Sequence, residues 1–255
     1  MKLSIIIPVR NEESCIQETV ALIVKRLIDA KMDFEVLVVN DGSSDHTEEK
    51  LQELSTRFTT VRYVNNPKPN GFGLAVRKGL DHYKGDAAAI VMGDGSDNPD
   101  DIVEYYKKLN EGYECVFGSR FIKGSKVYDY PIHKLILNRL ANYFIKFFFH
   151  LKHNDITNAF KCYRREVIDG LRPFFSNHFN LTVELPLKAI IRGYQYAIIP
   201  ISWTNRKHGV SKLQIKEMGS RYLFVVLYLF LEKTLSRGDY VRKDKVKTTS
   251  STMAR

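Results

Sequence analysis

The sequence has few of the features that mark secreted or disulfide-bonded proteins. Its 255 residues include only three cysteines, Cys15, Cys115 and Cys162, which stand far apart. This number and spacing exclude a disulfide framework and a thiolate metal site, and they favour a reducing compartment. The apolar run that follows Lys2 is too short for a secretory signal peptide and lacks a small-residue cleavage site, so we expect none.

Long apolar segments are also missing. The stretch Tyr222–Leu231 holds about ten apolar residues, far fewer than the ~20 that span a bilayer as a helix. It is apolar nearly all round and has basic residues at both ends, which is typical of an interfacial helix or of a helix that contacts a partner. A core or dimer helix is the alternative, both for this stretch and for the aromatic segment Lys134–Lys152.

Acidic residues are outnumbered by basic ones. The chain has 29 Asp and Glu against 39 Lys and Arg, a formal net charge of +10. Such an excess indicates a phosphate-bearing partner, which can be nucleic acid, anionic lipid or a small molecule. Nucleic-acid binding needs a basic face interleaved with aromatic residues, whereas here the cations gather in one loop and after Lys212. We therefore expect no nucleic-acid partner. A solvated basic tail, expected to be disordered from Asp239 onward, is the alternative explanation of the positive net charge.

Short apolar runs rich in β-branched residues alternate with amphipathic segments in the first half of the chain. The expected strands are Leu3–Pro8, Phe34–Val39, Val61–Val64, Ala87–Met92 and Glu114–Gly118. The expected helices are Glu12–Ala30, a helix capped by Ser43 or Ser44, Gly71–Tyr83 and Asp100–Leu109. This alternation predicts an α/β fold with a mostly parallel sheet and helices on both faces. Such sheets bind ligands at the carboxyl ends of their strands.

The regular alternation ends near residue 122. The expected elements beyond it are helices at Lys134–Lys152 and Glu184–Arg192, a strand at Tyr194–Trp203, a loop at Thr204–Lys212 and a helix at Leu213–Leu235. We therefore expect one α/β domain over residues 1–212, C-terminal amphipathic helices that end with one at 213–236, and a basic tail at 237–255.

Two segments of this sheet could bind a nucleotide. Asp41 follows the second strand and precedes a helix, where it can accept a hydrogen bond from a ribose hydroxyl or a base while backbone N–H groups face anions. A plain turn capped by Asp and Ser is the alternative. In Asn70–Gly79, glycines at a helix start stand beside Arg77 and Lys78. These glycines allow a close approach of the backbone, either to a phosphate or to a neighbouring element.

Carboxylates gather after the fourth strand, in Met92–Asp101. Asp94 and Asp97 supply oxygen ligands of the kind that bind Mg²⁺ or Mn²⁺ together with substrate phosphates. The ion would neutralise charge on a departing diphosphate. A calcium loop is disfavoured because no Glu follows at the required distance. Capping of the next helix by Asp97 or Asn98 is the structural alternative, but it leaves Asp94 unexplained.

The loop Thr204–Lys212 contains Arg206, Lys207 and Lys212 around a glycine, with a histidine and a hydroxyl nearby. This composition predicts a mobile loop that binds phosphate, and a solvated basic loop is the alternative.

Taken in order, these segments resemble the motifs of the family 2 glycosyltransferases, in particular the dolichol- or polyprenyl-phosphate mannosyltransferase-like group. The matching stretches are SIIIPVRNEE (4–13), VVNDGSSDHT (38–47), NGFGLAVRKGL (70–80), IVMGDGSDNPDDI (90–102), GSRF (118–121), DITNAFKCYRR (155–165) and RKHGVSK (206–212). The resemblance implies a GT-A type, Rossmann-like fold. It also implies an inverting transfer from a nucleotide-diphosphate sugar, GDP-mannose or a UDP-sugar, to a polyprenyl or dolichyl phosphate.

The resemblance also implies roles for single residues. Carried over by position, the nucleotide-sugar site would consist of Pro8, Arg10, Glu12, Asp41, Gly71 and Arg77. The metal and diphosphate region would contain Asp94 and Asp97, and the acceptor side would contain Arg120. The phosphate-binding residues would be Arg206 and Lys212. There are departures from the family pattern: Gly93 and Gly95 occupy the two usual metal-binding Asp positions, Asn40 replaces a common Asp, and Ala159 a frequent Gly.

The chemistry expected at this site depends on the acceptor. A lipid phosphate is already ionised and needs no strong general base, whereas a glycan hydroxyl needs one, for which Asp97 is the candidate. Two alternatives stay open: transfer to a glycan hydroxyl in surface-polysaccharide synthesis, and a catalytically silent nucleotide-sugar-binding protein. We expect a peripheral protein on the cytoplasmic face of a membrane, with or without a membrane-embedded partner.

Overall fold

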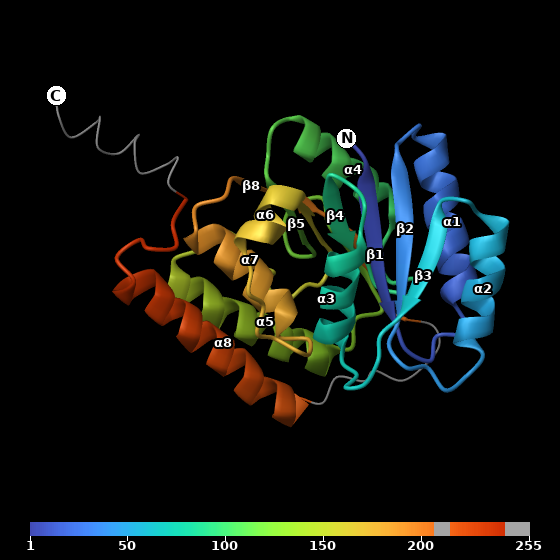
Figure 1. The fold of residues 1–255 in the computed structure, drawn as a ribbon. Coiled ribbons are helices and arrows are strands. Elements are labelled where there is room, and N and C mark those ends of the chain that lie inside the picture. Colours follow the sequence, from blue (N-terminus) through green and yellow to red (C-terminus); the bar gives the residue numbers. More distant parts are fainter. Residues whose placement is uncertain (207–214, 243–255) are drawn as a thin grey trace.

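A seven-stranded sheet forms the centre of the computed structural model, which describes residues 1–206 and 215–242 (Figure 1). Its strand order is β3-β2-β1-β4-β7-β5-β8. The strands are β1 (Leu3–Val9), β2 (Phe34–Asn40), β3 (Val61–Asn65), β4 (Ala87–Ile90), β5 (Cys115–Ser119), β7 (Lys161–Arg164) and β8 (Tyr196–Pro200). Only β7 runs against its neighbours, between β4 and β5. The prediction of a mostly parallel sheet is confirmed.

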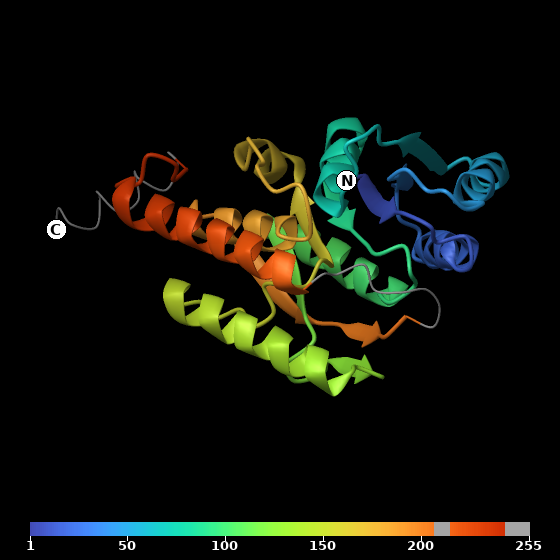
Figure 2. The same cartoon turned by 90° about the horizontal axis from the view of Figure 1, so that it is seen from below.

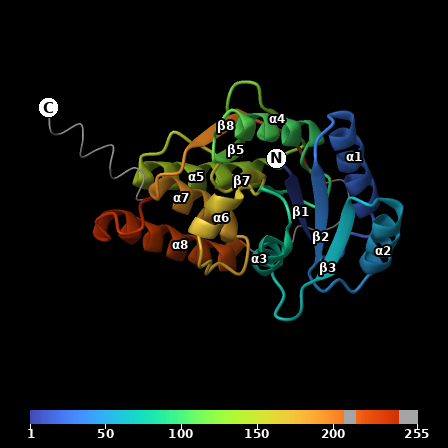
Figure 3. The ribbon, with the colours of Figure 1, turned by 45° about the horizontal axis from the view of Figure 1, so that its top comes forward.

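Helices cover both faces of this sheet. They are α1 (Ile16–Asp29), α2 (Thr47–Arg57), α3 (Phe72–His82), α4 (Pro99–Asn110), α6 (Arg165–Gly170) and α7 (Leu181–Ile191). Side chains alternate along a strand, so Ile5 and Ile7 of β1 pack with α1, α2 and α4, while Ile6 packs with α3, α6 and α7. Figure 3 shows α1 and α2 on one side of the strands and α3 on the other. Burial on both faces explains why β1 and β2 are mostly apolar; the buried polar pair Ser4 and Glu35 is hydrogen-bonded across the two strands at 2.6 Å.

Two long helices lie side by side beyond the sheet (Figure 2). These are α5 (Ile132–Phe149) and α8 (Ile215–Leu235). Their inner faces pack on each other and on α7, for example through the rings of Phe148 and Phe230, whose centres are 5.8 Å apart. In the part of the chain that the structure describes, no helix is both long and apolar enough to cross a bilayer.

Several boundaries differ from those expected. The helix expected over Lys134–Lys152 ends at Phe149, because His150 adopts a left-handed conformation with φ of 54°. The single strand expected over Tyr194–Trp203 is in fact two, β8 and β9 (Ser202–Thr204). Strand β9 leaves the main sheet and pairs with β6 (Lys126–Tyr128), which the sequence analysis did not predict.

The strand directions bring distant loops to one edge of the sheet. The carboxyl ends of the parallel strands β1, β2, β4 and β5 lie there, and antiparallel β7 begins at the same edge. The segments after Val9, Asn40, Ile90 and Ser119 therefore meet the segment that precedes Lys161. Most of the predicted site residues lie in these segments.

Candidate active site

Two carboxylates and one guanidinium form the centre of this edge. Asp94 follows β4, Glu12 follows β1, and Arg206 follows β9. The Nη2 atom of Arg206 is 2.7 Å from Asp94 Oδ2, and its Nη1 atom is 3.7 Å from Glu12 Oε1. The oxygens of Asp94 and Glu12 therefore converge on one cation. This geometry joins a residue predicted to bind metal, one predicted to bind nucleotide and one predicted to bind phosphate.

The backbone that carries Arg206 is fixed to the acidic motif. The Ser202 amide donates to Asp101 Oδ2 at 2.7 Å, and the Thr204 amide donates to the Ser96 carbonyl at 3.0 Å. Burial raises the pKa of Asp101 to about 6. These bonds hold β9 beside the Gly93–Asp101 segment, so Arg206 emerges next to Asp94. Lys212, the other predicted phosphate ligand, lies outside the described residues.

Asp97 has different surroundings from Asp94. Its Oδ2 accepts a hydrogen bond from the Met92 amide at 2.9 Å, and the residue is 8% exposed. Burial raises the pKa of this carboxyl to about 7. Its metal-binding role stays a prediction. The residue that caps α4 is Asn98, whose Oδ1 accepts a hydrogen bond from the Asp100 amide at 3.0 Å. This agrees with the alternative that Asp97 or Asn98 caps the helix.

The chemistry of the converging side chains suits a divalent ion. Among the described residues, no group of three or more His, Cys, Asp or Glu side chains could hold a metal. Mg²⁺ and Mn²⁺ are, however, commonly bound by one or two carboxylates together with substrate phosphates. Asp94 and Glu12 fit that pattern, since both already face the same guanidinium.

Asp41 organises the loop that leads into α3. Its Oδ1 accepts from Asn66 Nδ2 at 2.7 Å and from Asn70 Nδ2 at 3.3 Å, and its Oδ2 accepts from the Gly71 amide at 2.9 Å. Asn40, beside it, donates from Nδ2 to Asn65 Oδ1 at 2.9 Å. The turn interpretation thus accounts for these contacts, and the nucleotide role of Asp41 stays a prediction.

The glycines at the start of α3 approach another part of the protein. A Cβ at Gly73 would lie 2.6 Å from the carbonyl carbon of Asn177, and one at Gly71 would lie 2.6 Å from the Asn177 oxygen. Arg77 binds the same loop, with Nη1 2.8 Å from Asn177 Oδ1. Packing against the loop at Asn177 therefore explains Gly71 and Gly73, and a nucleotide role for Arg77 stays a prediction.

The loops after β1 and β2 are joined by their serines. The Asn11 amide donates to Ser43 Oγ at 3.0 Å, and the Ser44 amide donates to Asn11 Oδ1 at 2.8 Å. The expectation that one of these serines caps the next helix is wrong, because α2 begins only at Thr47, and His46 precedes it without a side-chain cap. Of the remaining predicted residues, Pro8 is buried within β1 and Arg10 is exposed directly after it.

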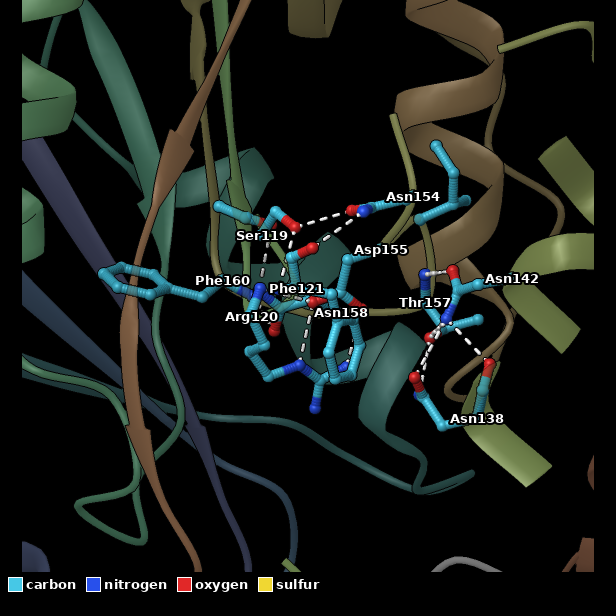
Figure 4. A network of polar contacts seen from close by, with 12 residues as sticks. Ser119, Arg120, Phe121, Asn138, Asn142, Asn154, Asp155, Thr157, Asn158 and Phe160 are labelled. Carbon is cyan, nitrogen blue, oxygen red and sulfur yellow. Dashed lines mark hydrogen bonds and ion pairs between the residues drawn. The ribbon is translucent and has the colours of Figure 1, made fainter. Parts of the chain in front are cut away.

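Arg120 lies at the end of β5 and is buried. Its Nε and Nη2 atoms contact the two carboxylate oxygens of Asp155 at 2.8 and 2.7 Å (Figure 4). Its guanidinium lies 5.3, 5.5 and 5.7 Å from the ring centres of Phe121, Tyr130 and Trp203. No role was predicted for Asp155 from the sequence, although it lies in the stretch DITNAFKCYRR. The signal available there was that this stretch matches a family motif.

The fold is that of a glycosyltransferase of the GT-A type. Residues 4–172 match the model of glycosyl transferase family 2, and the chain belongs to this family. It is 31% identical over 215 residues to polyprenol monophosphomannose synthase of Mycolicibacterium smegmatis, covering 82% of this chain and 80% of that protein. It is 29% identical over 225 residues to dolichol-phosphate mannosyltransferase of Pyrococcus furiosus, covering 85% of this chain but only 60% of that protein.

Solved structures agree on the fold. Glucosyl-3-phosphoglycerate synthase from Mycobacterium tuberculosis, in complex with Mn²⁺, uridine diphosphate and phosphoglyceric acid, superposes with a TM-score of 0.68. The match covers 90% of this chain and 78% of that chain at 19% identity. The same enzyme with Mn²⁺ and UDP-glucose gives a TM-score of 0.66.

Proposed function

We propose that this chain transfers a sugar, with inversion, from a nucleotide-diphosphate donor to a polyprenyl phosphate at a membrane surface. The observation that carries the proposal is the placement of two arginines at the same strand edge. Arg120 packs against the ring of Trp203, three residues before Arg206, which contacts Asp94. One site thus offers two guanidinium groups to two phosphate-bearing substrates. The two relatives named as polyprenol or dolichol phosphate mannosyltransferases support this acceptor.

The reaction needs little proton chemistry. An ionised phosphate oxygen of the acceptor forms a bond to the anomeric carbon, and the bond from that carbon to the nucleotide diphosphate breaks, so the diphosphate leaves with the electron pair. Arg120 positions the attacking phosphate, and Arg206 faces the diphosphate charge. A divalent ion held by Asp94 and Glu12 would supply further positive charge at the leaving group.

A direct assay tests this proposal. The protein is incubated with GDP-mannose or a UDP-sugar, with and without Mn²⁺, and with either farnesyl phosphate or farnesol as acceptor. We expect transfer to the phosphate and none to the alcohol, which differs only in the reacting group. Transfer to farnesol or to a glycan at a comparable rate would contradict the proposal. The donor base can be identified by thermal shift: the matching nucleotide diphosphate should raise the melting temperature, and should raise it more with Mn²⁺ than without Mn²⁺.

Transfer to a glycan hydroxyl is the second candidate function. One observation favours it: burial raises the pKa of Asp97 to about 7, which suits a general base at neutral pH. The Asp97→Asn variant separates the candidates, because loss of a base abolishes attack by a hydroxyl but leaves attack by an ionised phosphate largely intact.

Membrane contact through α5 and α8 completes the proposal. Their outer faces expose large apolar side chains, among them Leu140, Phe144 and Phe147 on α5 and Phe224, Leu227 and Leu231 on α8. Helix α5 contains no Asp or Glu. Of the two acidic residues of α8, Glu217 lies in its first turn and Glu232 is buried against Arg192, whereas Lys233 is exposed. An apolar face with basic flanks fits an anionic bilayer, on the cytoplasmic side if the expected location holds.

Flotation with anionic liposomes tests this contact. A Phe147→Glu, Leu231→Glu double variant places two charges on the face, and we expect at least a tenfold loss of binding from the apolar burial it removes. Ile28→Glu is the matched control, because the side chain of Ile28 in α1 is also exposed, at 57%. Helix α1 covers one face of the sheet, whereas α7, on which α5 packs, covers the other face. Equal binding by all three proteins would reject α5 and α8 as the contact.

A further inference from the structure

Asp155 holds both the backbone and the side chain of Arg120. Its Oδ2 accepts from the Arg120 amide at 3.0 Å and from Nε at 2.8 Å, and its Oδ1 accepts from Nη2 at 2.7 Å (Figure 4). Asp155 is 0% exposed. Although burial alone raises the pKa of this carboxyl, the Arg120 charge and hydrogen bonds lower it below its usual value. The pair is therefore ionised within the fold.

This contact leaves one direction for the rest of the guanidinium. A guanidinium is planar and rigid, so fixing Nε and Nη2 also fixes where Nη1 points. Nη1 lies 3.5 Å from the Tyr130 hydroxyl, among the rings of Phe121, Tyr130 and Trp203. Nη1 is thus the nitrogen that Asp155 leaves for another ligand.

The segment around Asp155 is itself attached to the end of β5. Asn154 Oδ1 accepts from Ser119 Oγ at 2.7 Å, and Asn154 Nδ2 donates to the Phe121 carbonyl at 3.0 Å. Asn158 Nδ2 donates to the Gly118 carbonyl at 3.3 Å. These bonds flank Arg120 on both sides, so the carboxylate and the guanidinium cannot drift apart independently. Supporting hydrogen bonds of this kind determine how precisely a binding side chain is positioned.

The other end of the segment is anchored to α5. Thr157 Oγ1 accepts from Asn138 Nδ2 and Asn142 Nδ2, each at 2.8 Å, and the Thr157 amide donates to Asn142 Oδ1 at 3.1 Å. Figure 4 shows this second group of contacts beside the Arg120 pair. Thr157 therefore contributes to the same segment without touching Arg120, which makes it a suitable control.

We propose that Asp155 is the positioning residue of the acceptor site: it orients Arg120 so that Nη1 binds the phosphate of the polyprenyl phosphate. This inference rests on the proposed function and deepens it. Asp155 does not touch the substrate. It fixes the direction of a charge-assisted hydrogen bond, and an error of about 1 Å in such a group can cost about a hundredfold.

The single tryptophan of the chain provides a direct measurement. Because the Trp203 ring is 5.7 Å from the Arg120 guanidinium, its fluorescence should respond when farnesyl phosphate binds and should not respond to farnesol. In Asp155→Asn, which keeps the size of the side chain, we expect the Kd for farnesyl phosphate and the acceptor KM to rise by about 10- to 100-fold. The donor KM should change less than twofold.

Two further variants separate positioning from stability. Thr157→Val loses hydrogen bonds in the same segment, so it should lower the melting temperature but leave the Kd for farnesyl phosphate unchanged. In an Arg120→Gln background, Asp155→Asn should have little further effect on this Kd, because no guanidinium is left to orient.

The outcomes distinguish the two hypotheses. If wild-type fluorescence and turnover do not respond to farnesyl phosphate, the proposed function fails, and the role of Asp155 falls with it. If the wild type responds but Asp155→Asn keeps the wild-type Kd, or shows only the lower melting temperature of Thr157→Val, the positioning role alone is overturned. A donor KM that rises as much as the acceptor KM overturns it as well.

Discussion

The substitution Gly73→Ala tests whether the glycines of α3 serve packing or phosphate binding. Its new Cβ would lie 2.6 Å from the carbonyl carbon of Asn177 and 2.7 Å from both the His178 amide nitrogen and the Ser176 oxygen. All three are backbone atoms, so no side chain can rotate away. Overpacking of this kind costs up to about 3 kcal/mol. Alanine regains at most about 1 kcal/mol of helix propensity.

The net loss of about 2 kcal/mol corresponds to a melting temperature lower by roughly 4–8 °C for a chain of this size. Gly219→Ala is the matched control, because Gly219 lies within α8 and a Cβ there would meet nothing within 4 Å. The control should raise the melting temperature by roughly 2–4 °C, as removal of a helical glycine does. Thermal unfolding followed by circular dichroism measures both. A Gly73→Ala protein that melts like the wild type yet no longer binds nucleotide diphosphate would refute the packing argument and restore the phosphate hypothesis.

Two other substitutions address the acidic motif. Asp94→Asn removes a charge that faces Arg206, so turnover should fall by at least tenfold while the melting temperature changes by only a few degrees; wild-type turnover on donor and acceptor would remove Asp94 from the site. Burial raises the pKa of Asp97 in the folded protein to about 7, above the value of the unfolded chain. Between about pH 4 and pH 7 the folded state therefore holds a proton that the unfolded state has lost, so the contribution of Asp97 to the free energy of unfolding declines as the pH rises through this range. Asp97→Asn should flatten the dependence of the unfolding free energy on pH in that window, as urea titrations at several pH values can show; an unchanged slope would mean that Asp97 titrates normally.

The parallel half of the fold could be predicted because its signal is local. Both faces of β1 and β2 are covered, so each is a short run of mostly apolar residues that no helix period fits. Strand β7 was missed because Lys161–Arg164 is short and mixed, and its place between β4 and β5 depends on a chain reversal that no local pattern encodes. The small β6–β9 sheet was missed for the same reason, since its strands are three residues each and far apart in sequence.

The candidate site shows the same division. Parallel strands end at the same edge of a sheet, so the order of the strands alone predicted that the segments with Glu12, Asp41, Asp94 and Arg120 lie at one edge. It could not assign partners, since these depend on contacts between remote side chains. Arg120 and Asp155 are 35 positions apart in sequence, yet their side chains meet at 2.7 Å.

The two arginines differ in the number of carboxylates beside them, which bears on metal dependence. Arg120 is matched by the single carboxylate of Asp155, so this pair is neutral and can hold a phosphate by a directed hydrogen bond from Nη1. Arg206 faces two carboxylates, Asp94 and Glu12. Under the proposed function, the nucleotide diphosphate would bring its negative charge beside these two carboxylates, and like charges at close range repel strongly where water is excluded. We therefore propose that a divalent cation shared between the carboxylates and the diphosphate would reduce this repulsion, since Mg²⁺ and Mn²⁺ prefer oxygen ligands of this kind.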